Sequence, residues 1–130
     1  SGDFMADVAY DITQIPEKEN SFDLIICHHI LEHVIEDVKA MKELHRVLKP
    51  NGTVLIQTPF KEGEIYEDYS ITSEAERLLH FGQEDHVRIY SIDGLKNLLE
   101  NSGFTISVTQ FEKDTYLGFS DKETILFATK

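Results

Sequence analysis

Two short segments of the chain carry most of the side chains that could do chemistry. The first, Cys27 to His33, reads CHHILEH and places a thiol, three histidines and a carboxylate close together. The second, Phe81 to Tyr90, reads FGQEDHVRIY and ends in an acid, a histidine, an arginine and a tyrosine. Histidine and carboxylate groups exchange protons near neutral pH, and arginine clamps carboxylates or phosphates. Each segment is therefore a candidate wall of an active site.

His29, Glu32 and His33 also match the spacing H-x-x-E-H, in which two histidines on one helical face hold a zinc ion. Here the motif directly follows an apolar run typical of a strand, and Val34 to Asp37 interrupts any long helix. Short motifs often match by accident, so we assign no metal ligand from the sequence. His33 could instead donate to a backbone carbonyl.

The second segment allows two interpretations. In one, His86 takes a proton from an acceptor, Arg88 clamps an acidic group and Tyr90 orients either of them. In the other, Asp85 and Arg88 form an internal ion pair and His86 anchors the loop.

The remaining titratable candidates are less suited to catalysis. Cys27 as a nucleophile is disfavoured, because a thiol buried in a strand is usually inert. His45 and His80 fall on predicted helices and are expected to be surface or packing residues.

The apolar pattern predicts the elements that position the first segment. Phe22 to Cys27 is a nearly continuous apolar run, typical of a parallel strand covered on both faces. Thr53 to Thr58 has the same character. Between them a helix is predicted to end at Pro50, from apolar residues that recur every three or four positions: Val38, Met41, Leu44 and Leu48. Strand, helix and strand form a right-handed βαβ unit.

The rest of the chain predicts an α/β domain. Val8 to Ile12 indicates the end of a strand, and residues 60–72 indicate an acidic surface loop. The other predictions are a helix opened by the Ser73 and Glu76 capping box, a helix capped by Ser91, and antiparallel strands at Phe104 to Phe111 and Glu123 to Thr129.

Ligands of open α/β sheets bind beyond the carboxyl ends of the parallel strands. Three groups of residues follow predicted strand ends and should line that edge: Asp11 and Ile12, Cys27 to His29, and Thr58 to Phe60.

The wording of these segments resembles a known family. Phe22 to Gly52, with LEH and RVLKPNG, is similar to the central part of class I S-adenosylmethionine-dependent methyltransferases of the type 11 kind. The phrase from Gly82 to Tyr90 is similar to one found in a bacterial branch of these enzymes. The resemblance runs from about Asp7 to Lys130. It implies an incomplete Rossmann-like fold with parallel strands and a C-terminal antiparallel pair, S-adenosylmethionine as cofactor, and methyl transfer to a small-molecule acceptor.

The resemblance also implies a cofactor wall. Asp11 would accept a hydrogen bond from the adenine amino group, Ile12 would pack on the ring, and Cys27 and His28 would lie beside the methionine part. As an alternative, Asp11 is a turn former that caps local backbone amides.

On the acceptor side, the resemblance points to the two histidine-bearing segments. His29, His86 and Tyr90 are the predicted catalytic residues, and His33 and Arg88 are predicted to contact the substrate.

Parts of the family pattern do not occur in the sequence. No G-x-G-x-G is present, and in the family that loop, the first strand and the acid that holds the ribose lie upstream. We therefore expect a fragment of a longer enzyme that binds cofactor weakly by itself. The alternative is a noncatalytic interaction module.

The family's strand order, 3-2-1-4-5-7-6, has a consequence for assembly. Without strands 1 and 2, the strand at Phe22 to Cys27 lacks a neighbour, and an exposed apolar edge attracts a partner. We expect the Val8 to Ile12 strand to move onto it, or two chains to form a homodimer there.

Composition limits the remaining classes. A length of 130 residues with 41% hydrophobic content indicates one domain, residues 1–130. The net charge of -12 argues against nucleic acid as a partner. No apolar run is long enough to cross a bilayer, which argues against a membrane protein. The single cysteine favours a reducing compartment, so we expect a cytoplasmic protein.

Overall fold

The computed structural model describes residues 11–81, 86–111 and 123–130. Its elements, in chain order, are β1 (Phe22–His28), the 3-10 turn η2 (Leu31–His33), α1 (Asp37–Val47), β2 (Leu48–Gln57), β3 (Tyr66–Glu67), α2 (Glu74–Phe81), β4 (Arg88–Ile89), α3 (Ile92–Asn101), β5 (Thr105–Phe111) and β6 (Glu123–Thr129).

Four of these strands form one sheet in the order β1-β2-β6-β5. β1 and β2 are parallel, and β6 is antiparallel to both β2 and β5. This order matches 4-5-7-6 of the family's numbering, so the predicted incomplete Rossmann-like sheet with a C-terminal antiparallel pair is confirmed.

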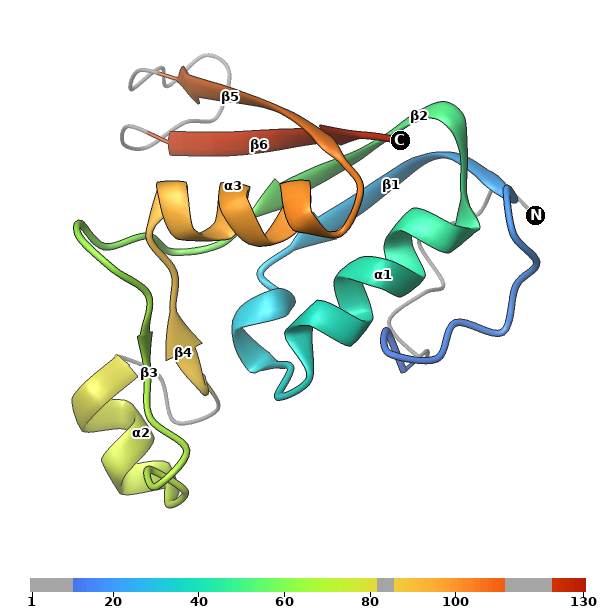
Figure 1. Ribbon diagram of the computed structural model, residues 1–130. Coiled ribbons are helices and arrows are strands. Elements are labelled where there is room, and N and C mark those ends of the chain that lie inside the picture. The colour runs from blue at the N-terminus through green and yellow to red at the C-terminus, as the bar shows by residue number, and fades with distance from the viewer. Residues whose placement is uncertain (1–10, 82–85, 112–122) are drawn as a thin grey trace, which may run out of the picture.

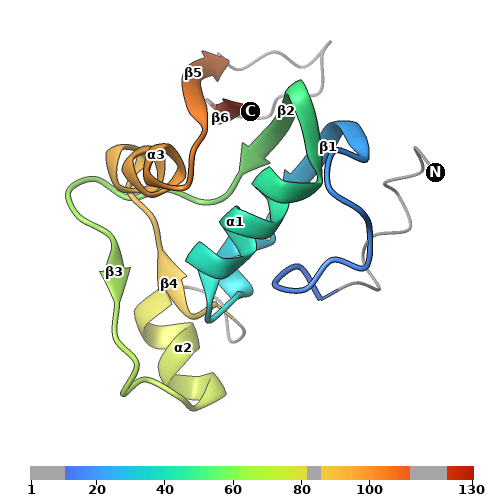
Figure 2. The same cartoon turned by 45° about the vertical axis from the view of Figure 1, so that its right-hand side comes forward.

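The helices α1 and α3 cover one face of this sheet (Figures 1 and 2). Alternate strand residues point toward them, because side chains of a strand alternate between the two faces. The resulting core contains Ile25, Cys27, Val54, Ile56, Leu126 and Ala128 from the strands, and Met41, Leu44, Leu95 and Leu99 from the helices.

The opposite face of β1 is open. Leu24 and Ile26 retain 40% and 39% exposure, and no helix of the described residues lies over them. The prediction that this strand is covered on both faces is therefore wrong for the described chain. The apolar run is suited to a layer on each side, but α1 and α3 supply only one.

Local sequence signals predict most boundaries well. Ser91 accepts a hydrogen bond from Gly94 N as an N-cap. Ser73 Oγ likewise accepts from Glu76 N, which is one half of the predicted capping box, and it donates to Glu76 Oε1. α1 ends at Val47, before Pro50, and the chain passes directly into β2. At Gly52, within β2, a Cβ atom would lie 2.9 Å from the Lys49 carbonyl oxygen, so only glycine fits this position.

The region 60–72 is not only a loop. Tyr66 and Glu67 form β3, which pairs antiparallel with β4 at Arg88 and Ile89. With α2, these strands form an arm that extends away from the main sheet (Figure 2). A two-residue strand leaves no periodicity in the sequence, which explains why the pattern did not reveal it. The pairing places Glu67 opposite Arg88.

The described helices include none that is long and apolar enough to cross a bilayer.

Candidate functional site

The carboxyl ends of β1 and β2 lie side by side, as predicted. Cys27 pairs with Ile56 and His28 with Gln57 in the parallel register. His28 Nδ1 lies 2.9 Å from Gln57 Oε1, while Cys27 is buried in the core. The strand end therefore exposes His28 and buries the thiol, and the predicted cofactor contacts of Cys27 and His28 stay predictions.

The chain turns sharply after β1. His29 has a φ of 52°, and its backbone N–H donates to the Gln57 carbonyl at 2.8 Å. The left-handed backbone conformation of His29 directs the chain out of the sheet and into η2. Within η2, Glu32 is buried with 1% exposure.

Glu32 joins the two histidine-bearing segments. Its Oε2 atom lies 3.3 Å from His29 Nδ1 and 3.9 Å from His86 Nε2. The rings of His33 and His86 meet edge to face, with centroids 4.6 Å apart. The structure thus brings together three predicted site residues, His29, His33 and His86, around a buried carboxylate.

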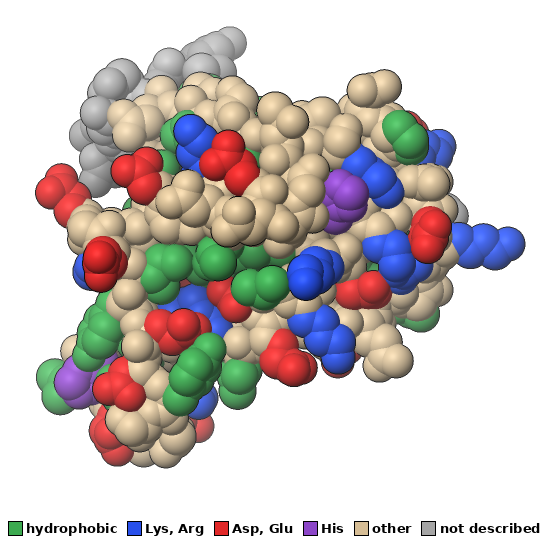
Figure 3. Space-filling view, in the orientation of Figure 1, with side chains coloured by type: hydrophobic (Ala, Val, Ile, Leu, Met, Phe, Trp, Pro, Cys, Tyr) green, Lys and Arg blue, Asp and Glu red, His purple; other side chains and the backbone are tan. Residues whose placement is uncertain are grey.

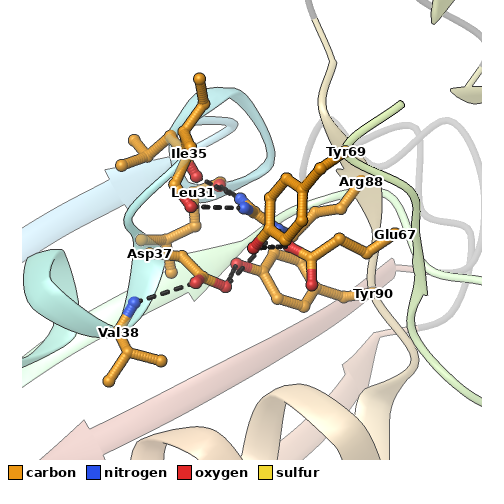
Figure 4. A network of polar contacts seen from close by, with 9 residues as sticks. Leu31, Ile35, Asp37, Val38, Glu67, Tyr69, Arg88 and Tyr90 are labelled. Carbon is orange, nitrogen blue, oxygen red and sulfur yellow. Dashed lines mark hydrogen bonds and ion pairs between the residues drawn. The ribbon is translucent and has the colours of Figure 1, made fainter. Parts of the chain in front are cut away.

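The second segment is held against η2 by its backbone and by Arg88. Val87 N donates to the Glu32 carbonyl at 2.9 Å. The Arg88 guanidinium is fully buried and donates to three carbonyls of the turn (Figure 4): Leu31 at 2.9 Å, Val34, and Ile35 at 2.8 Å. These bonds use the rigid fork of donors that arginine provides.

Two carboxylates balance this buried charge. Arg88 Nε lies 2.7 Å from Glu67 Oε1 and 3.6 Å from Asp37 Oδ2. Burial by itself would lower the pKa of the Arg88 guanidinium, but Tyr90, Glu67 and Asp37 raise it above its ordinary value. Arg88 is therefore a permanent cation at the centre of the network.

Tyr90 belongs to the same network. It is fully buried, and its hydroxyl donates to Asp37 Oδ2 at 2.6 Å. Burial and the nearby Asp37 carboxylate raise the pKa of the Tyr90 phenol far above its ordinary value. The phenol therefore stays protonated at physiological pH.

Arg88 and Tyr90 thus fit the alternative interpretation of an internal network. Their partners are Glu67 and Asp37; the predicted partner Asp85 lies outside the described residues. A side chain with no exposed surface cannot easily touch an acceptor, so their substrate-binding and catalytic roles stay predictions. The sequence offered no signal for Glu67, because β3 was not foreseen.

Asp11 lies on the surface and shapes its own turn. Its Oδ1 accepts hydrogen bonds from Thr13 N at 2.9 Å and Thr13 Oγ1 at 2.6 Å, which lower the pKa of the carboxyl. Asp11 and Ile12 are not part of a strand, and Ile12 packs against the core. This is the turn-forming alternative; the adenine contact stays a prediction. Val8 to Tyr10 lie outside the described residues.

The other two histidines behave as packing and surface residues, as expected. His45 packs edge to face on Phe104 with ring centroids 5.0 Å apart, and burial lowers its pKa. His80 is exposed and lies 2.8 Å from the Tyr66 hydroxyl.

Comparison with known proteins decides the family. Residues 2–108 match the family described as methyltransferase domain. This chain belongs to the methyltransferase domain family.

Curated relatives of this methyltransferase domain are distant and longer. An uncharacterized protein of Methanocaldococcus jannaschii is 31% identical over 99 residues, which are 73% of this chain and 40% of that protein. The human mitochondrial arginine-hydroxylase NDUFAF5 is 32% identical over 91 residues, which are 69% of this chain and 26% of that protein. The chain thus spans less than half the length of these relatives.

Solved structures share the fold of this methyltransferase domain. An S-adenosylmethionine-dependent methyltransferase of Thermotoga maritima has a TM-score of 0.68 at 21% identity, covering 93% of this chain and 62% of that one. The [4+2]-cyclase SpnF has a TM-score of 0.67 at 18% identity, covering 93% of this chain and 55% of that one.

The buried guanidinium of Arg88 leads to a prediction about stability. In Arg88→Lys, an ammonium cannot reach all three turn carbonyls, so buried acceptors lose their donors. We expect the free energy of unfolding to fall by about 3 kcal/mol or more, measured by urea denaturation. In the control Arg77→Lys, on α2, the change should stay within about 0.5 kcal/mol. Equal losses in both variants would contradict the assigned role of Arg88.

The raised pKa of Tyr90 predicts how stability depends on pH. A group whose pKa is raised by folding contributes stability that is complete below its unfolded value, about 10, and is lost as the pH rises above it. We expect the free energy of unfolding to decline above that pH, by at most about 1.4 kcal/mol per pH unit from this residue. In Tyr90→Phe the decline should be shallower. Identical slopes in urea denaturation at pH 9 to 11 would refute the prediction.

Proposed function

We propose that this domain works within a longer enzyme that transfers a methyl group from S-adenosylmethionine to a small-molecule acceptor. The family match over residues 2–108 carries this proposal, and the strand order supports it. The relatives include the C-methyltransferase UbiE of Haemophilus ducreyi, 27% identical over 106 residues. A Burkholderia thailandensis N1-methyltransferase of the same fold was solved with S-adenosylhomocysteine bound. Relatives named hydroxylase and cyclase make a direct test of the reaction necessary.

The described residues fit one wall of such a cofactor site. His28 ends β1 and pairs with Gln57, the last residue of β2. Thr58 comes next, and its buried hydroxyl has no hydrogen-bond partner among the described residues. When bound, S-adenosylmethionine supplies an electrophilic methyl group. The chain contains no G-x-G-x-G to approach its methionine part, so we expect the rest of the longer enzyme to complete the site.

The acceptor side is supported by the carboxylate-centred histidines. Glu32 lies within reach of both His29 and His86 and can orient their rings. A histidine oriented in this way takes a proton from an acceptor as it reacts. We assign this role to His29 or His86, with His33 beside them as the substrate contact. Arg88 and Tyr90 then act as positioning residues, because their network holds η2 against the 86–90 segment.

The open side of β1 favours self-association as a second property. Leu24 and Ile26 are exposed, and among the described residues β1 has only β2 as a strand neighbour. Antiparallel pairing with β1 of a second copy would continue the sheet across a two-fold axis and align these side chains. We propose a homodimer through this edge, which is also the basis of the alternative interaction module.

The remaining proposals concern location and other partners. The single cysteine supports a cytoplasmic location. Acidic and basic side chains are interspersed on the helix-covered face, which presents no continuous basic surface for a phosphate backbone (Figure 3).

The enzymatic proposal is tested on this chain and on the product of its complete reading frame. Because the glycine loop is absent, we expect this chain to bind S-adenosylhomocysteine only weakly in calorimetry. The complete product should bind it with micromolar affinity and transfer labelled methyl groups to small molecules of a cell extract. There, His86→Gln should lower kcat about 100-fold, whereas His80→Gln should not. Binding by the complete product without any methyl transfer would contradict the proposed function.

The dimer is tested by sedimentation of this chain at micromolar concentration. We expect a dimer for the unaltered chain and a monomer for the double variant Leu24→Lys with Ile26→Lys, because lysines protect sheet edges from pairing. The control is Val108→Lys on β5, the opposite edge, where an apolar residue is also exposed. A monomer at every concentration, or loss of the dimer in the control alone, would rule out the β1 interface.

A further inference from the structure

Glu32, His33 and His86, together called the histidine–glutamate cluster, form a compact set of metal-ligating side chains. Each residue offers one donor atom, and the three atoms all lie within 4.8 Å of one another. We propose that this cluster binds one divalent transition metal ion of the zinc type. The proposal does not depend on methyl transfer; with the ion bound, His86 is a ligand and the proton-accepting role belongs to His29.

The spacing is close to that of a loaded site. Zinc bonds to nitrogen and oxygen of about 2.0 to 2.2 Å at tetrahedral angles separate the ligand atoms by roughly 3.3 to 3.6 Å. The pair Glu32 Oε2 and His86 Nε2 is already at 3.9 Å. The ligand atoms therefore need to approach one another by about 1 Å to hold an ion.

The buried carboxylate provides an independent observation. Glu32 has 1% exposure, and its Oε1 atom has no hydrogen-bond partner among the described residues. Burying an unpaired carboxylate oxygen costs free energy. The hydrogen bond of this carboxylate with His29 is made by Oε2. A bound cation would compensate the charge of the whole group, including the unpaired Oε1.

Contacts that involve no metal already hold the two segments of the histidine–glutamate cluster together. Val87 N bonds to the Glu32 carbonyl, and Arg88 binds the carbonyls around η2. The ligands thus come from two segments that other interactions already clamp together. His29 Nδ1 lies 3.3 Å from Glu32 Oε2. His29 would not bind the ion itself but would orient the carboxylate that does.

Two imidazoles and one carboxylate are a donor set that suits zinc, with a fourth position for water or another oxygen ligand. His33 is only half-buried, so solvent reaches the cluster from its side. The triad differs from the H-x-x-E-H pattern in the sequence, because η2 is too short to place His29 and His33 on one helical face. His86, from the second segment, replaces His29.

The test is calorimetric titration of the tag-free, chelator-treated chain with Zn²⁺, supported by absorption spectra with Co²⁺. We expect one equivalent to bind and the Co²⁺ spectrum to show tetrahedral coordination. Removing a residue that only hydrogen-bonds to a metal ligand lowers metal affinity by about 10- to 100-fold. Removing a ligand itself should therefore lower the affinity for Zn²⁺ by roughly 100-fold or more. His33→Ala and Glu32→Gln are the deciding variants, and circular dichroism without metal checks that each folds.

His80→Ala is the matched control, since His80 is exposed on α2 and outside the cluster. It should bind Zn²⁺ as the unaltered chain does. The absence of a one-equivalent site, unchanged affinity in His33→Ala, or an equal loss in His80→Ala would each overturn the proposal. The titration uses no cofactor or acceptor, so its result is independent of whether the enzyme transfers methyl groups.

Discussion

The structure depends on one buried cation. The Arg88 guanidinium has no exposed surface and stays charged, so its N–H groups must all find acceptors inside the protein. It finds them in the carbonyls of the turn after β1 and in the Glu67 carboxylate, while Asp37 balances its charge from 3.6 Å. Arg88 therefore determines the path of the chain between β1 and α1, and it ties the arm of β3 and β4 to the sheet.

The geometry of the candidate site depends on these contacts of Arg88. His86 lies two residues before Arg88, and the intervening Val87 bonds to the backbone of Glu32. Backbone and guanidinium contacts thus hold the segment that carries His86 beside the buried carboxylate. Side chains whose positions are set by their surroundings are preorganised, which favours both proton transfer and metal binding.

Local signals in the sequence were sufficient for the strands of the main sheet, the helix caps and the meeting of the β1 and β2 ends at one sheet edge. They could not identify the partners of Arg88. Glu67 lies in an acidic stretch where several carboxylates are equivalent by pattern, and only the pairing of β3 with β4 selects it. The same limit applies to Asp11, whose spacing fits a ligand contact and a turn equally well. Its hydrogen bonds to Thr13 arise from local geometry that the sequence alone left open.

The two halves of the predicted active site differ in how much of them this chain supplies. The cofactor wall consists of strand ends whose apolar face remains open at Leu24 and Ile26, and it lacks a glycine loop. On the predicted acceptor side, this chain supplies the three histidines His29, His33 and His86 around the Glu32 carboxylate. Chemistry that depends on the histidines can therefore be studied in this domain alone. Chemistry that depends on the cofactor requires whatever completes the sheet.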